Sequence, residues 1–311
     1  MSGDARGTDD RTDRATDAPD WPGPTIDTTK AHPARVYDVL LGGKDNYEVD
    51  REAAAAALAV NPRGYLDVRH NRDFLRRAVS HVTGTTGIRQ FLDIGTGLPT
   101  RENVHQIAQR TAPDTKVVYV DNDPVVLAHA RALLTSHPEG RTAYVHADLR
   151  TPGRILDEAA ETLDLSRPVA LVLVSVLHFV EDEEAYPVVA ELIGRLAAGS
   201  VVVLSHLSAD FNPVAIGGVA QTFRARGFSF VLRSREQVAR FAAENGLELV
   251  EPGVVRVHEW RPDRIEDVVR AAPADPAYVA SLDYVDRTKY LDITDVRDED
   301  INLYAWVAHK R

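Results

Sequence analysis

The regular spacing of polar residues at the ends of apolar runs is the feature that most restricts how this chain folds. Five strand-like runs (FLDI, KVVYVD, TAYVHAD, PVALVLVSV and SVVVLSHL) alternate with helical stretches such as NVHQIAQR and AYPVVAELIGRLA. This alternation is typical of βαβ units in a parallel sheet. The polar residues that end the runs follow one another at intervals of 28, 27, 27 and 30 residues, about one strand plus its crossover. They are Asp93, Asp121, Asp148, Ser175 and Ser205.

Parallel sheets bind their ligands in the crevice outside the carboxyl ends of the strands. We therefore expect these five residues to share one site. Two later runs, LELVEPGVVRVHEW and INLYAWVAHK, predict two more strands, with an antiparallel strand near the C-terminus. The predicted fold is α/β and Rossmann-like, with a mostly parallel seven-stranded sheet and helices on both faces.

The chain before the first strand predicts helices. PARVYDVLL begins with proline and stops at Gly42 and Gly43, and REAAAAALAV has a high helix propensity. YLDVRHNRDFLRRAVSHV places its apolar side chains on one helical face. We expect a solvated tail over 1–27, a helical N-terminal cap over 28–85, and a cofactor-binding domain over 86–311 with lid insertions at 208–228 and 261–300 that shape the acceptor pocket.

The turn after the first run, FLDIGTGLPT at residues 91–100, restricts the kind of ligand. A phosphate-binding loop needs free backbone N–H groups, and Pro99 removes one of them. Asp93 adds a negative charge, and like charges about 4 Å apart repel by roughly 4 kcal/mol at an effective dielectric constant near 20. Gly95 and Gly97 still allow a positive φ and a close approach of the backbone. The turn therefore favours a ligand with a positive group over a pyrophosphate.

Two further carboxylates follow at the next two strand ends. Asp121 closes VVYVD, a position from which an acidic residue accepts hydrogen bonds from ribose hydroxyls. Asp148 in HADL is placed to accept one from the exocyclic amine of adenine. A ligand with an adenine, a ribose and a cationic group suits all three acidic positions. S-adenosylmethionine has these parts, and we predict it as the cofactor.

Longer blocks of sequence carry a resemblance to known proteins. DxGxG followed by acids at the next two strand ends resembles the cofactor site of class I S-adenosylmethionine-dependent methyltransferases. From about Ala34 to the C-terminus the chain resembles, more narrowly, an actinobacterial S-adenosyl methyltransferase family formerly catalogued as a domain of unknown function. The blocks that carry this are ARVYDVLLGGKDNYEVDREAA, NRDFLRRAV, GIRQFLDIGTGLPTRENVHQIAQ, VVYVDNDPVVLAHARALL and VLHFVEDEE. The resemblance implies the class I methyltransferase fold and the cofactor, and leaves the methyl acceptor open.

The resemblance also implies roles for single residues. Asp93, Gly95, Thr96 and Gly97 would surround the methionine part and the ribose, and Asp121 would hold the ribose hydroxyls with Asn122 and Asp123 beside it. Asp148 and Leu149 would contact the adenine, and Ser175 and Val176 would line the sulfonium side. Asp123 has a second interpretation, as the N-cap of the helix that begins at Pro124.

LLGGKDNY, at residues 40–47, has two interpretations. A glycine C-cap followed by an Asp-Asn turn accounts for both glycines. Alternatively, the N-terminal helices fold over the crevice, with a basic residue on the cofactor carboxylate and a tyrosine covering the site. The candidates for these contacts are Lys44, Arg35, Tyr37 and Tyr47.

Methyl transfer gains much of its acceleration from holding the acceptor in line with the methyl group. A hydroxyl or protonated amine acceptor also benefits from a base, for which histidine is the natural choice. His178 follows the fourth strand and His206 ends the fifth, so both are candidate catalytic residues. The alternative for each is a hydrogen-bonded residue of the wall. No spacing typical of a metal site occurs, so no metal is predicted, and no G-x-S-x-G motif occurs, so serine hydrolysis is not supported either.

The composition limits the kinds of partner and the chemistry that we expect for this protein. The chain has 311 residues, a net charge of −11 and no cysteine. The negative charge disfavours a nucleic-acid surface, and the absence of cysteine excludes thiolate ligands and a cysteine nucleophile. No apolar run is long enough to cross a bilayer, and the N-terminus lacks the apolar core of a secretory signal. We expect a cytoplasmic protein that methylates a small molecule, in an oligomeric state that the sequence leaves open.

Two other functions fit part of the pattern. A protein that binds S-adenosylmethionine or S-adenosylhomocysteine without transferring the methyl group fits the lack of a compelling catalytic base. An NAD(P)-dependent oxidoreductase shares the strand–turn–helix arrangement, although Pro99 and Asp93 argue against it.

Overall fold

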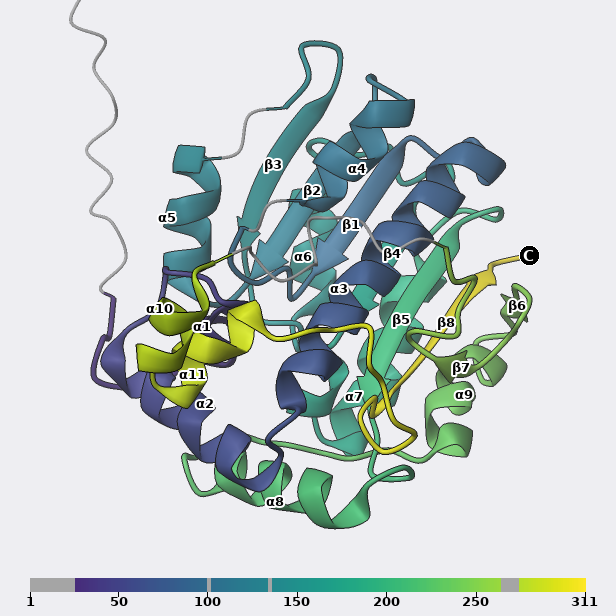
Figure 1. The fold of residues 1–311 in the computed structure, drawn as a ribbon. Coiled ribbons are helices and arrows are strands. Elements are labelled where there is room, and N and C mark those ends of the chain that lie inside the picture. Colours follow the sequence, from purple (N-terminus) through teal and green to yellow (C-terminus); the bar gives the residue numbers. More distant parts are fainter. Residues whose placement is uncertain (1–25, 100–101, 134–135, 264–273) are drawn as a thin grey trace, which may run out of the picture.

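The computed structural model describes residues 26–99, 102–133, 136–263 and 274–311 (Figure 1). The predicted tail over 1–27 lies almost entirely outside the described residues. The core is an eight-stranded sheet with the order β3-β2-β1-β4-β5-β8-β6, in which β7 also pairs with β8. The strands are β1 (Gln90–Ile94), β2 (Lys116–Asp121), β3 (Arg141–His146), β4 (Ala170–Val174), β5 (Val201–Leu207), β6 (Glu248–Leu249), β7 (Val255–Arg256) and β8 (Leu303–His309).

Strands β1 to β5 pair in parallel, and β8 runs antiparallel beside β5. The chain moves outward from β1 to β3 and then returns to pair β4 with β1, so the strand order reverses beside β1. Ligands of open α/β sheets bind at such a switch point. The predicted Rossmann-like arrangement, with its antiparallel strand near the C-terminus, is confirmed.

The predicted number of seven strands is wrong by one. LELVEPGVVRVHEW was expected to form a single strand but pairs with β8 in two short pieces, with Glu248 opposite His309 and Val255 opposite Ala305. Between them, Pro252 has no N–H to donate to a ladder, and Gly253 adopts a φ of 82°. The chain therefore leaves the sheet and rejoins it, giving β6 and β7.

Helices cover both faces of the sheet, and alternate residues of each strand enter two separate apolar clusters. In β1, Phe91 belongs to the cluster shared with α3 and α4, and Leu92 to the cluster shared with α6, α7 and α9. The helices are α1 (Pro33–Leu41), α2 (Glu48–Val60), α3 (Gly64–His81), α4 (Val104–Thr111), α5 (Pro124–Leu133), α6 (Pro152–Ala159), α7 (Asp182–Gly194), α8 (Pro213–Arg224), α9 (Arg235–Ala243), α10 (Pro276–Ser281) and α11 (Tyr284–Arg287).

The N-terminal helices have two different positions. Helix α1 packs on α2, and α2 packs on α8, where a Cβ added at Gly218 would lie 3.2 Å from the Cβ of Val60. Helix α3 instead crosses the face of the sheet, with Phe74 and Val79 fully buried in the core (Figure 1). The cap over 28–85 thus contains two helices beside the site and one that shares the core of the sheet.

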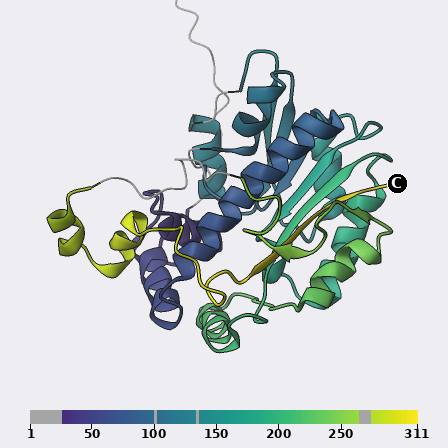
Figure 2. The ribbon, with the colours of Figure 1, turned by 45° about the vertical axis from the view of Figure 1, so that its right-hand side comes forward.

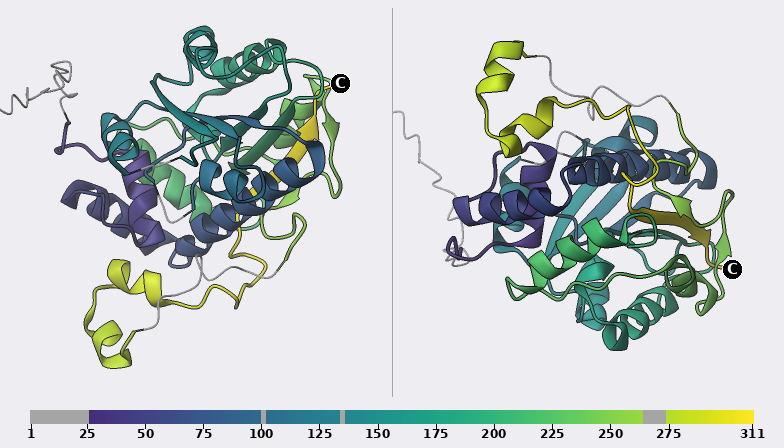
Figure 3. Two further views of the ribbon diagram at one scale, coloured as in Figure 1. Left: turned by 90° about the horizontal axis from the view of Figure 1, so that it is seen from above. Right: turned by 60° about the horizontal axis from the view of Figure 1, so that its bottom comes forward.

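The polar side of α3 is buried as well, because the late part of the chain covers it. Arg77 donates to the carbonyl oxygens of Val257 and Trp260, and Nε2 of His70 lies 2.9 Å from the carbonyl oxygen of Ile293. Beyond these contacts, α10 and α11 project from the body of the molecule beside α2 (Figures 2 and 3). Within the residues that the structure describes, no helix combines the length and apolar character that a bilayer crossing requires.

Candidate functional site

A cavity of about 480 Å³ lies at the carboxyl ends of the parallel strands, between the sheet and helices α1, α2, α3 and α8. This volume is in the range of small-molecule and cofactor sites. Twelve of the fifteen residues predicted for the site line it, and Lys44, Asp123 and His206 do not. The twelve are Tyr37, Asp93, Gly95, Thr96, Gly97, Asp121, Asn122, Asp148, Leu149, Ser175, Val176 and His178.

The glycine turn after β1 uses its backbone donors inside the protein. The N–H groups of Gly95 and Thr96 donate to the carbonyl oxygen of Val120 at 2.8 and 3.3 Å. The N–H of Gly97 donates to Asp121 Oδ2 at 2.9 Å. These three N–H groups therefore do not form a phosphate cradle, which agrees with the interpretation of Pro99 and Asp93.

Gly95 is needed because another element touches it. A Cβ added at Gly95 would lie 2.4 Å from Cγ2 of Val176, and the residue has a φ of 72°. Gly97 also has a positive φ, of 67°, which glycine adopts without strain. The turn after β1 and the turn after β4 thus meet so closely that a side chain at position 95 would separate them.

Two buried carboxylates give the sheet side of the cavity a preference for a cation. Burial raises the pKa of Asp93 to about 6, and a hydrogen bond from the Thr96 hydroxyl, at 3.0 Å, opposes this shift. Burial also raises the pKa of Asp121, although the N–H groups of Asp123 and Gly97 donate to its two oxygens. A positive ligand group stabilises the ionised form of both acids.

Arg72 lines the same part of the cavity and was not predicted as a site residue. It lies on α3, it donates to the carbonyl oxygen of Glu102, and its charge lowers the pKa of Asp93. A guanidinium suits a carboxylate ligand group. The signal in the sequence was the NRDFLRR block, which was interpreted as part of an amphipathic helix and of the family resemblance, with no role for Arg72.

The end of the cavity at Asp148 is more open to solvent. Asp148 Oδ1 accepts from the N–H of Arg150 at 2.8 Å, and Asn122 Nδ2 donates to Asp148 Oδ2 at 3.4 Å. The Arg150 side chain bridges to Glu184 at 2.9 Å and to the carbonyl oxygen of Phe179 at 3.0 Å. Leu149 is buried and offers an apolar surface for a base.

Asn71, a second residue that the sequence analysis missed, ties α3 to the ends of β4 and β5. Its Nδ2 donates to Ser175 Oγ at 2.8 Å and to the Tyr37 hydroxyl at 3.1 Å, and its Oδ1 accepts from Ser205 Oγ at 2.6 Å. Ser175 adopts a φ of 55°, a conformation that is costly for residues other than glycine. The network holds this strained residue and its side chain at the cavity wall.

Three of the predicted contacts are placed elsewhere. Asp123 caps its own helix through the N–H of Val125, and its other oxygen pairs with His32 and Arg35 of the N-terminal region, at 3.2 and 3.1 Å. Arg35 is therefore engaged away from the cavity. Lys44 is exposed, while Tyr37 reaches the cavity and donates from its hydroxyl to the carbonyl oxygen of Val68 at 2.9 Å.

The two candidate histidines differ. His206 is fully buried outside the cavity, with Nδ1 2.7 Å from the carbonyl oxygen of Leu207 and Nε2 2.7 Å from Arg233. Both ring nitrogens are occupied, so the hydrogen-bonded wall residue is the interpretation that its position supports. His178 lines the cavity, and its Nδ1 is buried without a partner in the described residues. Burial, with the nearby charge of Arg233, lowers the pKa of His178 to about 3, so the imidazole is neutral at physiological pH.

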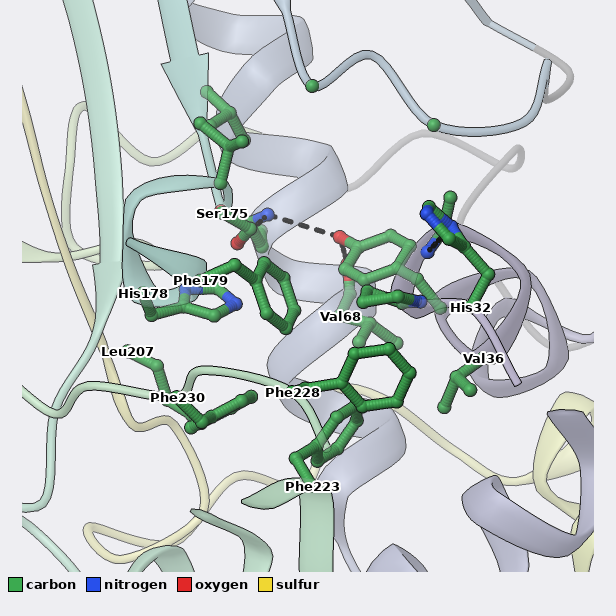
Figure 4. A pocket seen from close by; sticks show the side chains of 18 of the residues that line it. His32, Val36, Val68, Ser175, His178, Phe179, Leu207, Phe223, Phe228 and Phe230 are labelled. Carbon is green, nitrogen blue, oxygen red and sulfur yellow. Dashed lines mark hydrogen bonds between the residues drawn. The ribbon is translucent and has the colours of Figure 1, made fainter. Parts of the chain in front are cut away.

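The far side of the cavity is apolar. In Figure 4, the rings of Phe179, Phe223, Phe228 and Phe230 gather on one side of the view, and His178 lies beside Phe179. Helix α8, in the predicted lid segment 208–228, contributes Ile216, Val219 and Phe223 to this wall. None of the described residues in 261–300 lines the cavity, and 264–273 lie outside the described residues, so a contribution of this segment to the acceptor pocket stays a prediction.

The fold and the site together define a class I S-adenosylmethionine-dependent methyltransferase. S-adenosylmethionine fits the residues present, because its cationic part matches the two buried carboxylates and its ribose suits the fixed carboxylate of Asp121. A pyrophosphate fits less well, because the N–H groups of Gly95, Thr96 and Gly97 donate to acceptors within the protein. No cluster of His, Cys, Asp or Glu suited to a metal occurs in the described part of the chain.

The comparisons with known proteins agree with this class. A family model described as S-adenosyl methyltransferase matches residues 19–311, and the chain belongs to this family. A DUF574 family protein from Streptomyces avermitilis is 45% identical with a TM-score of 0.80, and the match covers 92% of this chain and 100% of that one. A candidate methyltransferase from Thermobifida fusca is 36% identical with a TM-score of 0.76, over 94% and 100% of the two chains. No curated protein matched the chain.

Proposed function

We propose that this methyltransferase acts on a small-molecule acceptor held under α1, α2 and α8. The observation that carries the proposal is that one cavity of about 480 Å³ joins the acidic strand ends to an apolar wall. Cofactor and acceptor must share this volume, which suits a small acceptor. Its walls come from the strand ends of the sheet, from α1, α2 and α3 of the cap, and from α8 of the lid segment.

In this proposal the sheet side holds the cofactor. Asp121 accepts from the ribose hydroxyls, with Asn122 beside it, while Asp148 and Leu149 contact the adenine. Asp93, Gly95, Thr96 and Gly97 surround the methionine part, and Arg72 pairs with its carboxylate. Ser175 and Val176 lie beside the sulfonium, and Tyr37 covers the site from α1.

The domain roles follow from the same arrangement. Residues 28–85 supply the cap, in which α1 and α2 cover the cavity and α3 carries Arg72 and Asn71. Residues 86–311 supply the cofactor-binding domain, and the segment 208–228 acts as a lid through α8. The helices α10 and α11 stay outside the cavity.

When bound, S-adenosylmethionine supplies an electrophilic methyl group. The protein's contribution is to hold the acceptor in line with that group and to exclude water from it. In this proposal, His178 accepts a hydrogen bond from the acceptor at the cavity wall. As a neutral imidazole with a low pKa, it is a weak base and receives a proton only when the attacking group has become strongly acidic.

Titration calorimetry with S-adenosylmethionine and S-adenosylhomocysteine tests the cofactor half of the proposal, and both should bind at micromolar concentrations. Release of S-adenosylhomocysteine in the presence of small hydroxyl and amine compounds tests transfer. Absence of binding at millimolar ligand would contradict the proposal. Binding of both forms with equal affinity, but no transfer to any small molecule, would support the non-catalytic alternative, and thermal stabilisation by NAD or NADP alone would support the oxidoreductase.

A further inference from the structure

The apolar half of the cavity contains four phenylalanines from three separate segments. Phe179 follows β4, Phe223 lies on α8, and Phe228 and Phe230 lie in the segment after α8. Figure 4 shows the four rings grouped together, with Leu207 and Val36 at the margins of the group. Aliphatic side chains complete the walls of this half: Val36, Leu40, Leu58, Leu75, Leu207, Ile216 and Val219.

The four rings form a supporting pair and a pair that faces the cavity. Phe223 and Phe230 are buried and stack with their centroids 4.8 Å apart. Phe179 and Phe228 are half-buried and lie against this inner pair, with centroid distances of 5.4 Å from Phe179 to Phe230 and 6.0 Å from Phe228 to Phe223. The outer rings therefore keep surface for a ligand, and aromatic rings prefer to pack on such surface in offset or edge-to-face contacts.

Charged groups at the cavity lie mostly on the cofactor side. The charge of Arg72 lowers the pKa of Asp93, and Arg150 forms ion pairs with Asp148 and Glu184. Asp67 lines the cavity beside the apolar residues, but its oxygens already accept from the N–H of Asn302 at 2.6 Å and from Asn61 Nδ2 at 3.4 Å. The aromatic half thus provides little to neutralise a charged acceptor.

One polar group stands at the edge of the aromatic half. The His178 ring lies 4.3 Å from the Phe179 ring and 5.0 Å from the Phe230 ring, measured between centroids. It is buried, and its Nδ1 has no partner in the described residues, so the imidazole has hydrogen-bonding capacity left for a ligand. Burial of a polar group without a partner is costly, and a ligand hydroxyl would remove that cost.

We infer that the methyl acceptor is an uncharged aromatic small molecule that packs its ring on Phe179 and Phe228 and sets a hydroxyl group beside His178. This inference rests on the proposed function. In the transfer step, the bond between the acceptor oxygen and the methyl carbon forms while the bond between that carbon and sulfur breaks. The hydroxyl proton passes to the imidazole of His178 and then to solvent, and the products are an aryl methyl ether and S-adenosylhomocysteine.

Three probes with one ring system and different charges test the inference. 1-Naphthol, 1-naphthoate and 1-naphthylmethylamine are titrated by calorimetry into the protein saturated with S-adenosylhomocysteine. We expect 1-naphthol to bind at least tenfold more tightly than the two charged probes. Equal or tighter binding of the anion or the cation would overturn the inference. If S-adenosylhomocysteine binds but 1-naphthol does not, the acceptor class is wrong and the cofactor site stands; if S-adenosylhomocysteine does not bind, the proposed function fails.

Leucine variants separate ring packing from apolar bulk. Phe179→Leu and Phe228→Leu should each weaken 1-naphthol binding about fivefold, since an aromatic pair contributes roughly 1 kcal/mol beyond its area, and should keep the affinity for S-adenosylhomocysteine. Phe211→Leu is the matched control, because Phe211 packs on Tyr304 at 5.0 Å outside the cavity. Phe179→Tyr and Phe228→Tyr retain the ring and should retain binding. Wild-type affinity in both leucine variants, or its loss in both tyrosine variants, would overturn the inference.

Discussion

The two halves of the cavity are built in opposite ways. The acidic half comes from the carboxyl ends of parallel strands and the turns after them. Asp93 in β1 accepts from the Thr96 hydroxyl, and Asp121 in β2 accepts from the N–H groups of Gly97 and Asp123, so both are fixed beside the sheet. Most of the aromatic half comes from α1, α2, α8 and the segment after α8, whereas Phe179 and His178 come from the segment after β4. Under the proposed function, the cofactor site therefore depends on strand ends, whereas the acceptor site depends mainly on how the covering segments pack.

The largest expected effect comes from breaking the acidic half at Asp121. Asp121→Ala removes the acceptor of the ribose hydroxyls and also leaves the N–H groups of Gly97 and Asp123 without their partner. We expect the affinity for S-adenosylhomocysteine, measured by calorimetry, to fall at least about 100-fold, which corresponds to roughly 2.7 kcal/mol. The control is Asp157→Ala, at a surface pair with Arg195, which should change nothing. An unchanged affinity in Asp121→Ala would remove Asp121 from the site.

Breaking the connection between the halves should reduce stability. Asn71→Ala removes three hydrogen bonds among Tyr37, Ser175 and Ser205 in a buried position. We expect the free energy of unfolding to drop by about 2 kcal/mol, since buried partners left unsatisfied cost about 1–3 kcal/mol. Denaturant unfolding measures this. Gln106→Ala removes an exposed amide of α4 that accepts from the N–H of Asn103, and tests whether any lost amide has the same effect. An equal loss of stability there would contradict a special role for Asn71.

The pH dependence of cofactor binding sharpens the role of Asp93. Burial raises the pKa of Asp93 to about 6, so in the ligand-free protein the group is protonated below that pH. A cationic ligand favours the ionised form, so binding at lower pH must expel a proton. The affinity for S-adenosylmethionine should be full above pH 7 and fall by up to about tenfold per unit below pH 6. Asp93→Asn should bind more weakly and without this dependence; a wild-type profile that stays flat from pH 5 to 7 would argue against the assignment.

The smallest expected effect separates the two histidines. His178→Ala should weaken 1-naphthol binding to the S-adenosylhomocysteine complex about fivefold, the effect of one hydrogen bond of about 1 kcal/mol, and leave the cofactor affinity intact. His206→Ala should mainly lower stability, because it leaves the buried Arg233 without one acceptor. His137→Ala, at an exposed turn, is the control. If His206→Ala weakened 1-naphthol binding and His178→Ala only lowered stability, the roles assigned to the two histidines would be contradicted.

The sequence predicted the acidic half well because a strand followed by its crossover has a nearly constant length. Asp93 and Asp121 could be placed at the strand ends from that spacing alone. It did not predict Arg72 or Asn71, because polar residues on an amphipathic helix are indistinguishable from a solvated face until the segment that covers them is known. In α3 that face is buried by chain more than 180 residues later, as the bond from Arg77 to the Trp260 carbonyl oxygen shows.

The histidines and the edge of the sheet likewise could not be predicted from the local sequence, because their surroundings come from other parts of the chain. In the sequence, His178 and His206 are both found at the ends of strands. They are distinguished only by Arg233, which lies 2.7 Å from Nε2 of His206 and uses its hydrogen-bonding capacity. In LELVEPGVVRVHEW, the apolar pattern runs through Pro252 and Gly253, so a single strand was expected where the sheet has two pieces. For the aromatic half, the sequence indicated only the segment 208–228, which contains Phe223 and Phe228, because the four phenylalanines follow no periodic pattern that would bring them together.

A crystal structure of the complex with S-adenosylhomocysteine tests the central claim of two distinct halves most directly. We predict that the ribose lies on Asp121, the adenine beside Asp148 and Leu149, and the sulfur toward His178, with the space between Phe179 and Phe228 left for the acceptor. An adenine packed among the four phenylalanines, or a ribose away from Asp121, would contradict the account.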